Sequence, residues 1–253
     1  MGTVPENINA VTSEFMENIR EAFGDTLRSV ILYGPAARGE IIKKVPYINF
    51  MVVLEDNTPS ELARCSKYMK KWRKHLIVTP LFLDPGYIAR SLDTFPLEFL
   101  DMTSAYAVVS GDDVLEDIAF NDDDIRNQCE RELKGKLLHL RAEYLNLRDN
   151  KKALIDLVDR SLNTFRLLFT GALFLKDVEV PSDTDKLLGL VTKEYELDSS
   201  LLIKLRSVAR GDIKIDESEA DTLFDLYVEE LDTLSHAIDT LTEEESGDNV
   251  TDQ

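Results

Sequence analysis

The first half of the chain alternates short apolar runs with amphipathic segments. Apolar residues recur at the 3.6-residue period of a helix over 7–23, and Gly24 follows as a stop. Runs of β-branched and aliphatic residues predict strands over 28–33, 48–54, 76–83 and, at the sheet edge, 106–109. A helix over 59–72 and two short helices before residue 105 come between them. Strands that alternate with helices predict a mixed sheet with helices packed against it.

The second half of the chain is predicted to be helical almost to its end. Three acids at 122–124 form a good N-terminus for a helix that runs to residue 147, and shorter helices are predicted up to 208 and over 217–241. The helix over 151–175 carries an apolar stripe wide enough for a buried bundle helix: Leu154, Leu157, Val158, Leu162, Phe165, Leu168, Phe169 and Ala172. The predicted fold class is α+β, with a sheet domain over 1–119, an all-α helical bundle over 120–241 and a disordered acidic tail over 242–253.

The loop after the first predicted strand has a distinctive spacing. Gly34 and Pro35 end the strand, eleven residues (36–46) follow, and Tyr47 and Asn49 flank Ile48 at the start of the next strand. This pattern resembles the signature of the nucleotidyltransferase superfamily that includes the aminoglycoside adenylyltransferases, in which a strand, Gly-Ser and about a dozen residues precede Asp-x-Asp. Segments 80–85, 91–101 and 109–113 extend the similarity to about residues 15–150. The resemblance implies a nucleotidyltransferase-like mixed-sheet domain with flanking helices, followed by the helical bundle.

The residues that carry the chemistry of this superfamily are replaced. Tyr47 and Asn49 occupy the two aspartate positions, and the predicted strand 76–83, where the third carboxylate is expected, contains no acid. Nucleotidyl transfer depends on metal ions that neutralise phosphate charge, and Mg²⁺ prefers carboxylate ligands. Pro35 replaces the serine that offers a backbone N–H and a hydroxyl to phosphate. We therefore expect no catalytic residue, no cofactor and no transfer activity.

The sequence thus predicts a nucleotidyltransferase-like protein that acts as a binding or scaffold module. The positions of the former nucleotide site are Gly34, Pro35, Arg38, Gly39, Tyr47 and Asn49. Simpler explanations are a tight turn for the two glycines and a carboxylate partner for Arg38.

One alternative is an active adenylyltransferase for a small cationic or hydroxylated substrate, which would need Mg²⁺, a nucleoside triphosphate and relocated ligands among Glu40, Glu55 and Asp56. The latter two acids otherwise begin a polar loop. Another alternative is a nucleotide sensor without turnover, which uses Gly34, Arg38 and the Tyr47 ring.

Charge limits the partners of the chain. With 48 acidic and 29 basic residues the net charge is −19, which repels nucleic acid and favours a basic protein partner or a cationic small molecule. Segment 67–74 is a local exception, because five basic residues surround Trp72. This segment is either a site that stacks a nucleotide or the basic face of a helix. No membrane span or signal peptide is apparent, so we expect a cytoplasmic protein, and its helices could pair in a homodimer.

Other titratable residues give no specific signal. Cys65 and Cys129 are expected to be reduced and structural. The histidines lack the spacing of metal ligands. Four acids of the helical domain have the right type for a catalytic base, but a solvated helix face explains them better: Glu130, Glu132, Glu143 and Asp156.

Overall fold

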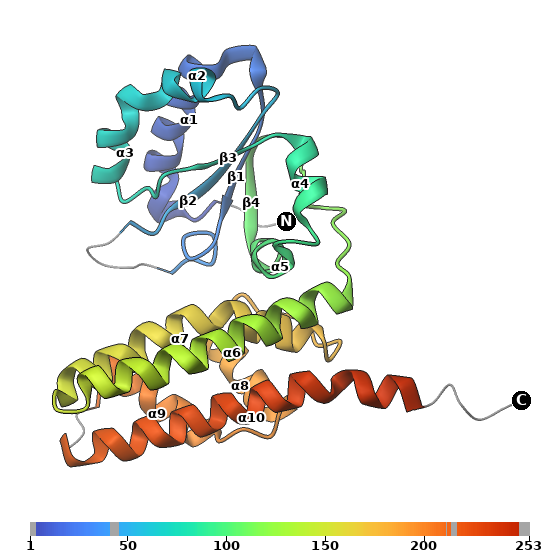
Figure 1. Ribbon diagram of the computed structural model, residues 1–253. Helices are drawn as coiled ribbons and strands as arrows, with labels where there is room; N and C mark the ends of the chain where they lie inside the picture. Colours follow the sequence, from blue (N-terminus) through green and yellow to red (C-terminus); the bar gives the residue numbers. More distant parts are fainter. Residues whose placement is uncertain (1–3, 41–45, 211, 214–216, 248–253) are drawn as a thin grey trace, which may run out of the picture. The chain divides into compact units, whose positions relative to one another are not determined.

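A computed structural model of the chain describes residues 4–40, 46–210, 212–213 and 217–247 (Figure 1). Within these ranges the fold is α+β, with ten α-helices and one four-stranded sheet, which confirms the predicted class. The chain divides into two compact units, Met1–Phe120 and Asn121–Gln253, and each is described by itself. None of the described helices combines the length and the apolar character that a bilayer span requires.

The sheet of the first unit is mixed, in the strand order β3-β2-β1-β4. Strand β1 (Leu27–Tyr33) pairs antiparallel with β2 (Asn49–Leu54) and with β4 (Tyr106–Gly111). Strand β3 (Leu81–Leu83) pairs parallel with β2. The four predicted strands are therefore present, and β4 lies at the sheet edge as expected.

The third strand is shorter than the predicted run over 76–83. Ile77 forms only an isolated parallel bridge with Ile48. Leu76 has a φ of 62°, in the left-handed region that β-branched and aliphatic residues avoid in strands, and Pro80 has no N–H to give to a ladder. Regular pairing therefore begins only at Leu81, in register with Met51.

Helices cover both faces of the sheet. Helix α1 (Asn9–Phe23) packs on the face that carries the even-numbered residues of β1 and β2, where the Phe15 and Phe50 rings stack with centroids 4.0 Å apart. Helices α4 (Pro85–Ser91) and α5 (Pro96–Ser104) contribute to the opposite face, with the odd-numbered residues. Burial on both faces explains why these strands read as continuous apolar runs rather than as an alternating pattern.

The predicted helix over 59–72 is divided into three pieces. These are α2 (Pro59–Leu62), a 3₁₀ stretch (Ala63–Tyr68) and α3 (Met69–Lys74). Trp72 is 2% exposed, and its indole N–H donates to Asn18 Oδ1 at 3.2 Å. The segment is thereby fixed to α1. Short 3₁₀ turns at Glu6–Ile8, Gly24–Thr26 and Glu217–Glu219 complete the described elements.

The described residues of the second unit form five α-helices. They are α6 (Asp122–Leu147), α7 (Lys151–Phe174), α8 (Thr184–Glu194), α9 (Ser199–Arg210) and α10 (Ala220–Gly247). Helix α7 contacts each of the other four, and every residue of its predicted apolar stripe is buried. The last helix continues to Gly247, beyond the predicted end at 241, and residues 248–253 of the predicted tail lie outside the described residues.

Candidate functional site

The loop that follows β1 closes on itself. The backbone N–H of Arg38 donates to the Gly34 carbonyl at 3.1 Å, that of Gly39 to Ala36 at 3.1 Å, and that of Glu40 to Pro35 at 2.9 Å. A phosphate-binding loop instead presents such N–H groups to its ligand. In this loop three of them are engaged internally, and Pro35 has none.

The two loop glycines are required by the backbone. Gly34 has a φ of +72° and Gly39 a φ of +76°, a region that costs other residues about 1–2 kcal/mol. A Cβ atom on Gly34 would also lie 2.7 Å from Nδ2 of Asn49, whereas one on Gly39 would have no neighbour within 4 Å. These facts support the tight-turn explanation of both glycines and show that Asn49 lies directly against Gly34.

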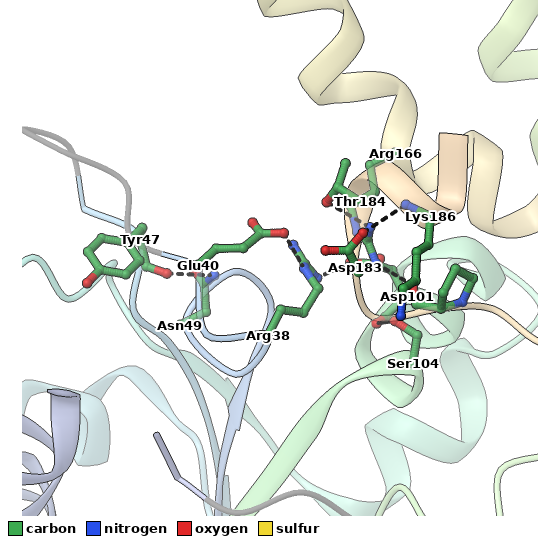
Figure 2. Close-up of polar contacts among 11 residues, drawn as sticks. Arg38, Glu40, Tyr47, Asn49, Asp101, Ser104, Arg166, Asp183, Thr184 and Lys186 are labelled. Carbon is green, nitrogen blue, oxygen red and sulfur yellow. Dashed lines mark hydrogen bonds and ion pairs between the residues drawn. The ribbon is translucent and has the colours of Figure 1, made fainter. Parts of the chain in front are cut away.

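Arg38 is held by carboxylates of its own unit. Its Nε lies 3.3 Å from Glu40 Oε1 and its Nη1 lies 3.6 Å from Asp101 Oδ2, and the side chain is only 5% exposed (Figure 2). Asp101 belongs to α5, so this contact also joins the loop to the helix that covers the sheet. A guanidinium that already faces two carboxylates has a much weaker attraction for phosphate.

The two positions that align with the aspartates of the resembling superfamily carry no carboxylate. Tyr47 is 7% exposed and belongs to the core on the α1 side of the sheet, and Figure 2 shows its ring directed away from Arg38. Asn49 donates its side-chain N–H to the Tyr47 carbonyl at 3.4 Å. On the neighbouring segment of the sheet, the residues that follow the Ile48–Ile77 bridge are Val78 and Thr79 rather than acids. These donors do not fit Mg²⁺.

The carboxylates suggested as alternative metal ligands, Glu40, Glu55 and Asp56, do not lie together. Glu40 bonds to the loop at the end of β1, whereas the Glu55 N–H donates to Thr26 and its carboxylate pairs with Arg28 at 2.5 Å, at the start of β1. A strand of this length separates its ends by about 20 Å. Asp56 accepts from the Thr58 N–H at 2.9 Å and so belongs to the turn before α2. Glu40 and Glu55 are therefore too far apart to bind one metal ion together, and the described residues contain no cluster of three potential metal ligands.

Two tyrosines, Tyr33 and Tyr106, lie on neighbouring strands of the sheet beside the loop. Tyr33 pairs with Asn49 on one side and with Tyr106 on the other. Burial raises the pKa of Tyr33. Burial, and then the hydrogen bond to Asp113 at 3.0 Å, raise the pKa of Tyr106 to about 12. Both phenols are thus neutral hydrogen-bonding groups, not bases, at physiological pH.

Sequence reasoning did not single out Asp101 or Asp113. Both lie in segments that carry the family resemblance, 91–101 and 109–113. Asp101 contacts Arg38, which lies much earlier in the sequence, and Asp113 accepts a hydrogen bond from Tyr106 at the other end of β4. Spacing alone gives no signal for such contacts, because a carboxylate on one element meets its partner only after the sheet has formed.

The basic segment around Trp72 does not form a stacking platform. The indole is buried, so it cannot receive a base. Lys67 pairs with Glu21 at 2.7 Å, and both Lys71 and His75 face Glu14. These three side chains follow helical spacing and contact α1, which supports the helix-face explanation and excludes the stacking one.

The two cysteines are buried, and one of the four candidate acids of the helical unit, Glu130, pairs with cations of its own helix. Both thiols are buried and free, and burial raises the pKa of Cys129 to about 12. Glu130 lies within ion-pair distance of Lys134 and Arg126, as expected of a solvated helix face.

No protein-family model matches the chain, and a comparison with curated proteins gives no match. The resemblance to nucleotidyltransferases therefore rests on the residues quoted above.

Proposed function

We propose that the chain is a nucleotidyltransferase-like module that binds a partner and does not transfer nucleotides. One observation carries the proposal: Arg38, the cation of the described turn over 34–40, has a side chain that is 5% exposed and faces Glu40 and Asp101. A transferase needs that charge, together with metal ions, on the phosphates of its substrate. In this chain the guanidinium stabilises the loop instead.

Two further facts support the proposal. The Tyr47 ring, which a nucleotide sensor would use for stacking, is buried in the core. The loop N–H groups of Arg38, Gly39 and Glu40 already have carbonyl partners. To bind a nucleotide, the loop would have to exchange these contacts for ligand contacts, at a cost of several hydrogen bonds.

Calorimetric titration of ATP and of GTP into the purified chain, each with and without Mg²⁺, tests the proposal. We expect no saturable heat in any of the four titrations. Saturable heat that requires Mg²⁺ and is lost in Asn49→Ala would overturn the proposal in favour of an enzyme. Saturable heat without Mg²⁺ that is lost in Arg38→Ala would overturn it in favour of a nucleotide sensor.

A further inference from the structure

A pocket of about 210 Å³ lies beside α3 in the first unit. Its walls are mainly apolar, from Pro46, Met69, Trp72, Ile77 and Val78. A cavity of about 150 Å³ holds a benzene ring, whereas small-molecule sites usually begin near about 300 Å³. The pocket therefore has room for one bulky apolar side chain.

Arg73 and Thr79 supply the polar groups of the pocket, and both are exposed. Lys70 and Lys74 are exposed neighbours on the same helix surface, since residues three and four apart lie side by side. In the part of the chain that the structure describes, none of the three cations forms an ion pair with a carboxylate. They differ in this from Lys67 and Lys71, which bind acids of α1.

These unpaired cations stand on a chain of net charge −19. Most of such a surface repels an acidic partner, so a local basic patch fixes where that partner can approach. The Trp72 indole is buried and hydrogen-bonded to Asn18, so the patch offers no aromatic face to a nucleobase. Charge complementarity therefore favours an acidic ligand, and the size of the pocket favours a ligand with one bulky apolar side chain.

We propose that this pocket docks a linear acidic segment of a partner protein through one bulky apolar anchor residue. The anchor enters the space between Met69, Trp72 and Ile77, and neighbouring carboxylates pair with Arg73, Lys70 and Lys74. Bidentate pairing suits the Arg73 guanidinium best. The inference rests on the proposed function in one respect only, since a partner-binding module needs a surface for its partner.

Fluorescence anisotropy with short fluorescein-labelled peptides tests this inference on the full chain at low salt. The probes are peptides of glutamate and aspartate around a central phenylalanine, tryptophan, leucine or methionine. Matched probes carry alanine at the centre, or lysine in place of the acids. We expect at least one acidic probe with an apolar centre to bind about tenfold or more tightly than its alanine counterpart, as burial of a large side chain implies. The lysine probes should not bind.

Charge reversal locates the site. Arg73→Glu should weaken binding about tenfold or more, whereas Arg90→Glu, which makes the same change in net charge on α4, should leave it nearly unchanged. Circular dichroism and thermal unfolding of both variants verify that they are folded. Arg73→Gln serves as a second variant if the first does not fold.

Three outcomes would overturn the inference: no difference between acidic and lysine probes, no effect of the central residue, or equal effects of the two charge reversals. Binding of oligothymidylate as tight as that of the peptides would also overturn it, because it would assign the patch to phosphates. The nucleotide titrations concern residues 34–40, Tyr47 and Asn49, none of which lines this pocket. Failure of the peptide test therefore leaves the proposed loss of nucleotide function intact, and the converse also holds.

Discussion

Arg38 and Arg73 lie in the same unit, and their surroundings are opposite. Arg38 occupies a loop that resembles a ligand site, yet its side chain is 5% exposed and faces two carboxylates. Arg73 belongs to no recognisable motif, yet it is exposed beside an apolar pocket. The comparison teaches that a motif marks where a site can be built, whereas the availability of charge decides whether a ligand can use it.

The largest effect is expected from Arg38→Ala. Removing one partner of a buried ion pair costs about 3–5 kcal/mol, and partial exposure of Glu40 and Asp101 lowers the expected loss to about 2–3 kcal/mol. Urea unfolding followed by the fluorescence of Trp72, the only tryptophan of the chain, reports on the first unit. The control is Arg28→Ala, which breaks an ion pair that is half exposed on both sides and should cost less than about 1 kcal/mol. Equal losses in the two variants would refute the structural role of Arg38.

The next effect concerns the loop backbone. Gly34→Ala combines an unfavourable φ with a 2.7 Å approach to Asn49 and should cost about 2–3 kcal/mol, whereas Gly39→Ala, with an open environment, should cost about 1–2 kcal/mol. Adding Asn49→Ala should reduce the Gly34→Ala loss to the level of Gly39→Ala. The same urea assay measures the three differences, and a double variant no more stable than Gly34→Ala would contradict the contact.

A smaller effect should appear at alkaline pH. A tyrosine ionises near pH 10 in the unfolded chain, whereas Tyr106 keeps its proton up to about pH 12 in the fold. Because the folded pKa is the higher one, the stabilisation is complete below pH 10 and declines as the pH rises toward 12. Urea unfolding between pH 8 and 11 should therefore show falling stability, with a shallower slope in Tyr106→Phe. An unchanged slope would indicate that burial and the hydrogen bond to Asp113 do not raise the pKa of Tyr106 in solution.

The smallest effect on stability is expected from Arg73→Ala. An exposed side chain without a described ion pair should contribute no more than about 0.5 kcal/mol. The variant should therefore unfold like the parent chain in urea while losing affinity for the acidic probes. A loss of stability comparable with that of Arg38→Ala would remove the contrast between the two arginines.

The sequence predicted those elements whose signal is local and strong. The stripe from Leu154 to Ala172 gave α7, and the apolar runs around Ile31 and Met51 gave the two central strands. The predicted strand over 76–83 was too long, because a run of apolar residues gives no information about the positive φ that Leu76 adopts.

The site was less predictable, since its decisive contacts are tertiary. The sequence left open whether Arg38 would bind a phosphate or pair with an acid, and only the packing of α5 against the sheet supplied Asp101. It likewise could not divide the basic segment into cations that bind α1 and cations that remain available. That division depends on which side of α3 faces Glu14.

The central place of β1 has a consequence for how the first unit assembles. Pairing of β1 with β2 closes a short stretch of chain, whereas pairing with β4 must bring residues 27–33 and 106–111 together across all intervening elements. Closure entropy rises with the logarithm of loop length, and non-local strand pairs form slowly. The pairing of β1 with β4 is also sterically demanding, because a Cβ atom at Gly111 would lie 1.9 Å from the Arg28 carbonyl oxygen. On the ribosome, the sheet can therefore be completed only after Gly111 has emerged.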